Sequence, residues 1–533
     1  MSASTDSQGL RHANSGNQAQ PNILFIMADQ LAAPTLSFLG GNTAKTPNLD
    51  RLAAEGVVFE SAYCNSPLCT PSRYVLMTGQ LPTRIGAWDN AADFPADYPT
   101  YAHYLRLRGY KTALSGKMHF CGPDQLHGFE QRLTTDIYPA DYGWFVDWEN
   151  FDTRPSYYHN MSSVTQAGPV LRSNQLDFDD EVIFQAQRYL YDRARSNDDQ
   201  PFCLTVSMTH PHDPYATPPE YWDRYTDKEI DLPSVNIADA DQDPHSARLL
   251  HVYQKDEKQI SEQQIRNARR AYYGNTSYVD DQIGKLMKIL QQTGLADNTI
   301  VVFSGDHGDM LGERGLWYKM SYFEWSARVP MLVWSPKRFT PKRVSQSVST
   351  IDLLPTFVDL AGLSGQSFTP IEYAMPIDGR SLMPHLRGEN GHDEVIGEYT
   401  GEGVVAPLFM IRRGDFKYVC CKGDPDQLFN LAEDPKELNN LADNPAFADT
   451  LEAFRRESAQ RWDSDAITER VLVSQRRRKL IARAHKQGVE PAWDHQPFTD
   501  ASRSYMRNNI DLDDLEYNAR FPRPNANEQK DAT

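Results

Sequence analysis

The sequence predicts an α/β fold in which a large, mixed and mostly parallel β-sheet lies between helices. Three short, continuous apolar runs at residues 22–27, 202–208 and 298–303 lead to this prediction. Strands that are buried on both faces of a helix-flanked sheet have this pattern. Longer segments with helical spacing separate the runs, as expected for strands joined by crossover helices.

Four segments have apolar residues at helical spacing. In the longest of them, Val279, Ile283, Leu286 and Leu290 recur at every third or fourth position, which indicates core packing. The predicted helices span residues 47–55, 100–108, 179–195 and 264–293.

A chain of 533 residues is too long for one simple core, which favours two packed domains with extensions. Beyond residue 390, strand-like segments at 395–399, 408–412 and 416–420 predict a smaller C-terminal α+β domain with an antiparallel sheet. From Gln475 onward the chain is Arg-rich and turn-rich, and it is interpreted as an extended tail laid over another surface. The expected division is 1–20 disordered, 21–390 the main domain, 391–474 the C-terminal subdomain and 475–533 the extension.

Composition argues against several classes of protein. The net charge of −18 opposes a nucleic-acid-binding surface, which requires clustered Lys and Arg. We find neither a secretory signal nor an apolar stretch long enough for a membrane helix, so no membrane partner is expected. The six cysteines show no metal-ligand spacing. A small number of cysteines in a long chain is typical of a protein in the reducing cytoplasm.

Polar side chains follow the three predicted strands at the point where each one ends. Asp29 and Gln30 follow the first strand, His212 lies shortly after the second, and Asp306 and His307 follow the third. Ligands of open α/β sheets bind at the carboxyl ends of strands, so these groups are expected at one site. Their oxygen and imidazole donors predict a metal there.

The densest local signal is Cys69-Thr-Pro-Ser-Arg73, which resembles the type I sulfatase signature. The resemblance implies an alkaline-phosphatase-like fold and oxidation of Cys69 to formylglycine by a maturation enzyme. The hydrated aldehyde has two hydroxyls, of which one attacks sulfur and the other later expels sulfate. Arg73 would fix the modified side chain with its planar, charged fork. Met77 and Gln80 depart from the usual continuation, but neither is a reacting group.

A second segment, Gly109-Tyr-Lys-Thr-Ala-Leu-Ser-Gly-Lys117-Met-His119, resembles the second sulfatase signature, with Met118 in place of Trp. The resemblance implies that Lys117 contacts the sulfate oxygens and that His119 acts as a base. In the same family pattern, His212 binds sulfate and faces the leaving group, and Lys319 bridges sulfate and the leaving-group oxygen.

The metal set departs from most sulfatases, because Gln30 and His307 stand where Asp and Asn are common. The combination is similar to choline sulfatases and to the related phosphonate monoester hydrolases. The expected ligands are Asp29, Gln30, Asp306, His307 and the modified residue 69. Oxygen-rich ligation favours Ca²⁺, while the imidazole leaves Mn²⁺ or Mg²⁺ open.

The C-terminal segment resembles the tail of choline sulfatases in Arg476-Arg-Arg-Lys, Trp493-Asp-His-Gln-Pro497 and Asp511-Leu-Asp-Asp-Leu-Glu516. The resemblance implies choline-O-sulfate as the substrate and a homo-oligomer, expected to be a tetramer, in which the tail packs on a neighbouring subunit. A trimethylammonium group is best held by aromatic faces and a carboxylate. The candidates for its site are Asn90, Trp144 and Glu402.

Two alternatives stay open. A phosphonate monoester or phosphodiester hydrolase would share the metal pattern and the nucleophile. A non-catalytic binding protein could retain the fold, although every expected reacting residue is present.

Overall fold

The computed structural model describes residues 19–138, 141–150, 159–255, 258–363, 371–489, 493, 495, 497–498, 505 and 510–522. An eight-stranded sheet with the order β10-β2-β9-β8-β1-β6-β3-β4 forms its centre. Neighbouring strands are parallel except where β9 pairs with β2 and β8, which confirms the predicted mixed, mostly parallel sheet. The strands are β1 Asn22–Asp29, β2 Val57–Tyr63, β3 Lys111–Gly116, β4 Gln131–Arg132, β6 Phe202–Pro211, β8 Thr299–Gly305, β9 Met331–Trp334 and β10 Lys342–Ser349.

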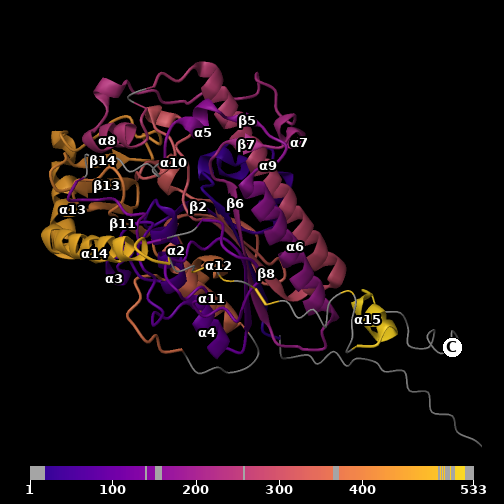
Figure 1. Cartoon of the computed structure of the whole chain (residues 1–533). Helices are drawn as coiled ribbons and strands as arrows, with labels where there is room; N and C mark the ends of the chain where they lie inside the picture. Colours follow the sequence, from indigo (N-terminus) through magenta and orange to yellow (C-terminus); the bar gives the residue numbers. More distant parts are fainter. Residues whose placement is uncertain are drawn as a thin grey trace, which may run out of the picture.

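Helices cover both faces of this sheet (Figure 1). Successive side chains of β1 point to opposite faces, so that Phe25 packs into one hydrophobic cluster and Leu24 into the other. This double burial explains the continuous apolar runs. One face is covered by α2 Cys69–Thr78, α4 Tyr101–Leu107 and α11 Leu353–Ala361, and the other by α1 Pro47–Glu55, α6 Asn174–Arg195 and the second half of α9 Glu262–Thr293.

The helix boundaries follow capping residues more closely than apolar spacing. Helix α1 has the predicted bounds, whereas α6 begins five residues before the predicted start. The reason is Ser173, whose hydroxyl accepts a hydrogen bond from the Leu176 amide and so fixes the first turn. Helix α9 begins two residues early at the capping box of Ser261 and Gln264.

The C-terminal part forms the expected antiparallel sheet, with the order β11-β12-β13-β14. One of its faces packs against α13, where Leu451 and Phe454 meet Ile411 and Tyr418. The elements are β11 Glu394–Tyr399, β12 Leu408–Arg413, β13 Phe416–Cys421, β14 Gln427–Asn430 and α13 Ala448–Arg461.

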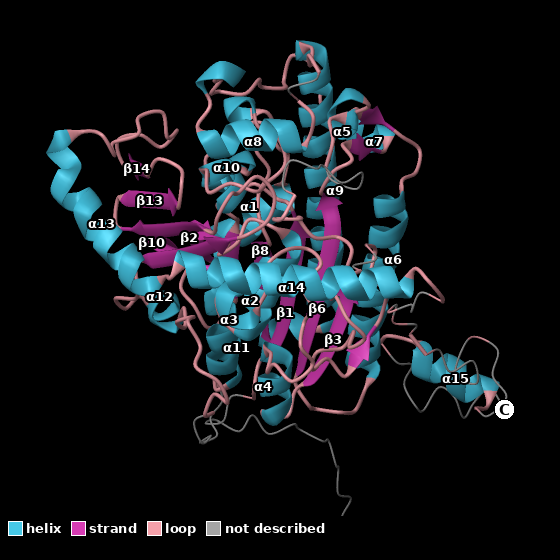
Figure 2. Ribbon diagram, turned by 60° about the vertical axis from the view of Figure 1, so that its left-hand side comes forward, coloured by secondary structure: helices cyan, strands magenta, loops and turns pink. Residues whose placement is uncertain are grey.

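A long helix, α14 Ser464–His485, crosses the boundary predicted at residues 474 and 475. Gln475 and Arg478 are buried in it, although this stretch was expected to lie loosely on a surface. In Figure 2, α14 runs across the front of the large sheet. Residues 1–18 and much of the predicted extension lie outside the described residues, and α15 Leu512–Ala519 is the described helix that follows α14.

Shorter elements complete the framework around the sheet. No helix among the described residues combines the length and the apolar character that crossing a membrane requires. The shorter helices and strands are α3 Pro82–Ile85, α5 Ser162–Thr165, α7 Pro219–Trp222, α8 Pro244–Val252, α10 Glu324–Ala327, α12 Met383–Arg387, β5 Gly168–Pro169 and β7 Ala216–Thr217.

Candidate active site

Two neighbouring parallel strands bring the predicted acidic residues together. Strand β1 ends at Asp29 and β8 ends at Gly305, one residue before Asp306, and Ala28 is paired with Gly305. The Asp306 carboxylate accepts hydrogen bonds from the backbone amides of Gln30 (3.0 Å) and His307 (2.9 Å). The strand ends therefore form one compact acidic centre.

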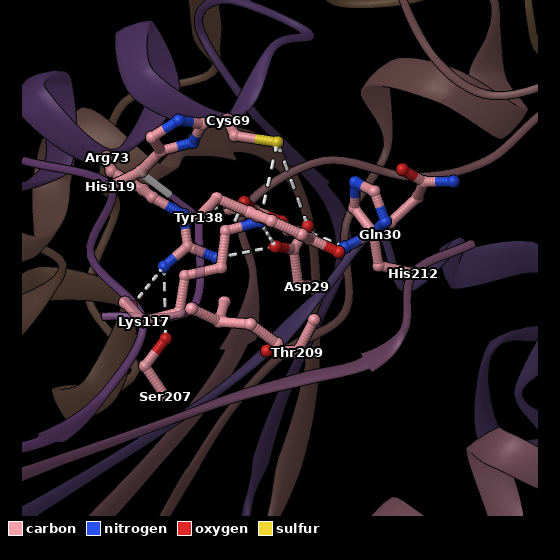
Figure 3. Close-up of polar contacts among 12 residues, drawn as sticks. Asp29, Gln30, Cys69, Arg73, Lys117, His119, Tyr138, Ser207, Thr209 and His212 are labelled. Carbon is pink, nitrogen blue, oxygen red and sulfur yellow. Dashed lines mark hydrogen bonds and ion pairs between the residues drawn. The ribbon is translucent and has the colours of Figure 1, made fainter. Parts of the chain in front are cut away.

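Helix α2 carries Cys69 at its first position, above this centre (Figure 3). The helix N-terminus contributes a partial positive charge there. One turn later, Arg73 directs its fully buried guanidinium to both carboxylates, with Nε 2.9 Å from Asp306 Oδ2 and one terminal nitrogen 3.2 Å from Asp29 Oδ2. Burial would lower the pKa of Arg73, but the two aspartates raise it. Arg73 is thus a permanent cation beneath Cys69.

The loop after β3 supplies the next two predicted residues. Its entry at Gly116 has a φ of +113°, and a Cβ there would lie 2.0 Å from the Ser207 carbonyl oxygen, so only glycine fits. Lys117 forms an ion pair with Asp29, and its Nζ is 3.8 Å from Cys69 Sγ. His119 adopts a left-handed backbone, which places its imidazole beside Cys69 (Figure 3).

The donor atoms of Asp29, Cys69, Asp306 and His307 all lie within 4.8 Å of one another, and all four residues are buried. Two carboxylates, one imidazole and the position of residue 69 form a donor set that suits a divalent cation. Cys69 Sγ is 3.2 Å from His307 Nε2 and 4.0 Å from Asp29 Oδ1, so the side chain at position 69 faces the same centre. The residues present therefore fit the metal that the sequence predicts.

Gln30 lies beside this cluster with its amide held by other partners. The amide nitrogen donates to Asp309 Oδ2 at 2.6 Å, and the amide oxygen accepts from Lys319 Nζ at 2.6 Å. Asp309 is buried, and burial raises the pKa of its carboxyl to about 6. The role of Gln30 as a metal ligand stays a prediction, with its second oxygen lone pair available for an ion.

Electrostatics at residue 69 favour an anion. Burial alone would raise the pKa of the Cys69 thiol, but Lys117, Lys319 and His307 lower it well below its ordinary value. Burial lowers the pKa of His119, which favours the neutral imidazole that a base requires. Burial opposes ionisation of Asp29, yet the nearby cations hold its pKa well below the usual range.

A lysine and a histidine face the same space. Lys319 Nζ lies 2.9 Å from His212 Nε2, and His212 Nδ1 lies 2.6 Å from the Asp213 carbonyl oxygen. These contacts place the His212 proton on Nδ1 and let Nε2 accept from Lys319. His210 instead lies with its Nδ1 2.6 Å from Asp179 Oδ2.

Sequence reasoning missed three side chains of this site. His159 Nε2 is 3.2 Å from Lys319 Nζ, and the Tyr138 ring centroid is 4.4 Å from Lys117 Nζ. Neither stands in a recognisable motif, because each is brought in by a long connection between strands. Asp309 was also missed, although its place three residues after Asp306 on the same strand-end loop was a usable signal.

The three residues predicted for the cationic end of the substrate lie around the same centre. Asn90 Oδ1 accepts from the Thr70 amide at 3.1 Å, directly after Cys69. The Trp144 ring is 6.2 Å from the His119 ring. Glu402 is buried, bonds Tyr399, and is close enough to Lys319 to feel its charge.

The sequence is similar to those of known proteins over most of its length. The sequence model of the sulfatase family matches residues 21–363, that of the choline sulfatase enzyme C terminal matches 469–521, and that of the N-sulphoglucosamine sulphohydrolase C-terminal part matches 312–462. A choline-sulfatase of Rhizobium meliloti (strain 1021) is 47% identical over 512 residues, which cover 95% of this chain and 99% of that protein. An arylsulfatase K of Bos taurus is 28% identical over 444 residues, covering 77% and 78% of the two chains.

Solved structures show the same fold. A phosphonate monoester hydrolase of Agrobacterium radiobacter superposes with a TM-score of 0.65 at 24% identity, covering 83% of this chain and 95% of that one. A sulfatase from Bacteroides thetaiotaomicron, described as putative, gives a TM-score of 0.64 at 25% identity and covers 90% and 97%. With its strand-end acidic centre, its Cys69 signature and these matches along nearly its whole length, the chain belongs to the sulfatase family and groups with the choline sulfatases within it.

Proposed function

We propose that this sulfuric ester hydrolase cleaves choline-O-sulfate to choline and sulfate, with residue 69 acting as formylglycine. The observation that carries the proposal is the pairing of a cationic cradle with a buried carboxylate that is close enough to Lys319 to interact with its charge. Lys117 and Lys319 suit the sulfate, and Glu402 suits the trimethylammonium group. The 47% identity to a protein named choline-sulfatase and the matching C-terminal segment support this choice of substrate.

The sulfate end is held by charge. The ammonium of Lys117 and the Lys319–His212 pair approach the space above Cys69 from two sides, so a sulfate placed there meets cations through several oxygens. A divalent ion on Asp29, Gln30, Asp306 and His307 would add Lewis acidity and favour ionisation of the attacking hydroxyl. Ca²⁺ is our first choice, and Mn²⁺ or Mg²⁺ would suit the imidazole.

Residue 69 as a hydrated formylglycine would supply one hydroxyl to attack sulfur and a second to expel sulfate. Arg73 stays beneath it and fixes its orientation through the two carboxylates. The departing alkoxide is a poor leaving group, so it requires a proton from Lys319 or His212, which are 2.9 Å apart. His119, with its lowered pKa, then accepts the proton of the second hydroxyl.

The leaving-group end is formed by Asn90, Trp144 and Glu402. A quaternary ammonium donates no hydrogen bonds and is held by aromatic faces and negative charge. Trp144 provides the ring, and Glu402 the carboxylate. An aryl sulfate, whose aryl group is uncharged, would use the same cradle but would gain nothing from this end.

The decisive experiment is the Cys69→Ser variant. We expect it to bind choline sulfate, because the cradle is intact, and to lose turnover by roughly a thousandfold or more, because serine lacks the second hydroxyl. Peptide mass analysis of the natural chain should show sulfur and two hydrogens exchanged for one oxygen at residue 69. Cys121→Ser, at a buried cysteine outside the site, is the matched control. Wild-type rates in Cys69→Ser would end the proposal of covalent catalysis.

The same assays separate the rival activity. A phosphonate monoester or phosphodiester hydrolase would prefer an aryl phosphonate to choline sulfate at equal concentration, whereas we expect the opposite order. A protein that only binds would release no choline at all.

We also propose a homo-oligomer, with four copies expected, that forms after a maturation enzyme has modified residue 69 in a reducing cytoplasm. The described C-terminal residues leave Leu480, Val489 and Phe498 largely exposed, as side chains that a second copy could cover. All six cysteines are free, in keeping with a reducing compartment. Light scattering of the full chain and of a chain ending at residue 488 should differ in mass if the tail holds the copies together.

A further inference from the structure

We propose that Arg478 of α14 is a positioning residue that sets the selectivity of the enzyme for a cationic leaving group. It lies outside the reaction centre and acts through the turn that carries Asn90 and the segment that carries Trp144. The inference rests on the proposed function of these two residues.

Arg478 forms a buried, two-pronged ion pair with Asp89. Its terminal nitrogens lie 2.5 Å from Oδ1 and 2.9 Å from Oδ2, and the two side chains are only 5% and 1% exposed. The guanidinium also lies 5.5 Å from the centroid of the Phe145 ring. A planar fork that satisfies both carboxylate oxygens fixes orientation as well as distance, which a lysine could not do.

The same helix holds both segments at further points. Gln475 Oε1 accepts from the Trp148 amide at 3.0 Å, and Lys479 Nζ is 2.7 Å from Asp147 Oδ2. On the other side, Val471 packs with Trp88 in a small apolar cluster. Helix α14 therefore clamps residues 88–89 and residues 145–148 against each other.

From this clamp, short connections lead to the leaving-group end of the site. Asn90 follows Asp89 and caps α2 at the Thr70 amide, one residue after Cys69. The Trp88 carbonyl accepts from Thr400 Oγ1 at 2.6 Å, two residues before Glu402. Trp144 directly precedes Phe145. A displacement of the 88–90 turn would thus move all three predicted substrate contacts.

The charge of Asp89 matters as well as its position. Asp89 is near enough to Glu402 to disfavour ionisation of that carboxylate. The guanidinium of Arg478 offsets the buried negative charge of Asp89 in the 88–90 turn, next to the site. The sulfate cradle is built differently, from residues on β1, α2 and the loops after β3 and β8, and none of the contacts described for it involves α14.

The test compares two esters across four variants of the full-length, metal-loaded enzyme. Arg478→Met removes the guanidinium, and Arg478→Lys keeps the positive charge but not the two-pronged geometry. The double variant Asp89→Asn with Arg478→Met also removes the guanidinium, but it leaves no unpaired carboxylate at residue 89. Arg476→Met is the matched control, because Arg476 lies on the same helix but is half exposed and pairs with the exposed carboxylates of Glu149 and Glu469. kcat and KM are measured for choline sulfate and for 4-nitrophenyl sulfate, with melting temperature and metal content for each protein.

We expect Arg478→Met to lower kcat/KM for choline sulfate roughly tenfold or more, mainly through KM, and to change that for the aryl ester by less than about threefold. Arg478→Lys should recover part of the loss, and Arg476→Met should match the wild type. If Arg478→Met does not fold, the double variant carries the same test, because it leaves no unpaired buried charge.

An equal loss on both esters, or an unchanged ratio between them, would overturn the inference and leave Arg478 with a purely structural role. Failure of the proposed function gives a different result, since the wild-type enzyme itself would then release no choline from choline sulfate.

Discussion

The carboxylate of Glu402 leads to a specific prediction about pH. Burial, with a smaller contribution from Asp89, raises its pKa from the ordinary 4.5 to about 7, while Lys319 and the Tyr399 hydroxyl oppose the shift. An acid whose pKa is raised is neutral below that value and charged above it. The attraction for a trimethylammonium group is therefore present above pH 7 and is lost as the pH falls through 7.

The size of the effect follows from the titration. With a pKa near 7, about nine tenths of Glu402 is ionised at pH 8 and about one tenth at pH 6. If only the ionised form binds the cation, kcat/KM for choline sulfate falls about tenfold between these two pH values from this group alone. Titration of His119 or of other groups in the cradle would add to the fall, but it would act on every sulfate ester.

The assay therefore uses the ratio of kcat/KM for choline sulfate to that for 4-nitrophenyl sulfate, measured from pH 5.5 to 8.5. Contributions of the cradle cancel in this ratio, and the titration of Glu402 remains. We expect the ratio to rise about tenfold from pH 6 to pH 8 in the wild type and to be low and flat in Glu402→Gln. A flat wild-type ratio, or the same rise in Glu402→Gln, would refute the assignment of Glu402 to the cation.

Two further predictions concern stability. Lys417 is fully buried, with Nζ 2.9 Å from Glu324 and 2.5 Å from Glu437, so Lys417→Met would strand two carboxylates and cost about 3–5 kcal/mol of unfolding free energy. Lys422→Met, at an exposed pair, should cost less than about 1 kcal/mol, and denaturant titration that finds equal losses would contradict this reasoning. Removal of the metal by a chelator should lower the melting temperature, because the bound ion offsets the repulsion between the carboxylates of the donor cluster. The corresponding loss of unfolding free energy is about 2.7 kcal/mol for an ion present at a hundred times its Kd. Return of Ca²⁺ or Mn²⁺ should restore it, and a melting curve unaffected by chelator would argue against a metal in this cluster.

The sequence predicts the sheet well because both faces of its strands are buried. Continuous apolar runs such as 22–27 have few other interpretations, and their polar ends identify the edge where Asp29 and Asp306 meet. The local signature around Cys69 identifies both the proposed nucleophile and Arg73, because the two residues lie one helical turn apart on α2. These features depend on short-range pattern alone.

Other features depend on contacts between distant parts of the chain. Arg478 resembles a surface residue within an Arg-rich run, and it is buried only because Asp89, 389 positions away, meets it. His159 joins the site through Lys319, with no motif around it. The capping serines that lengthen α6 and α9 are local signals, by contrast, and close attention to them would have corrected the helix starts.

The charge distribution connects these observations. A protein with a net charge of −18 attracts no sulfate ester over long range, so recognition has to come from the site itself. The proposed substrate, choline sulfate, has no net charge but carries both signs, and in the proposed site Lys319 and Glu402 would form the matching dipole. Lys319 also favours the ionised form of Glu402, so the residue proposed to hold the sulfate would help to prepare the carboxylate for the cation. The buried Arg478–Asp89 pair protects this dipole, because an uncompensated Asp89 would disfavour the ionisation of Glu402 on which it depends.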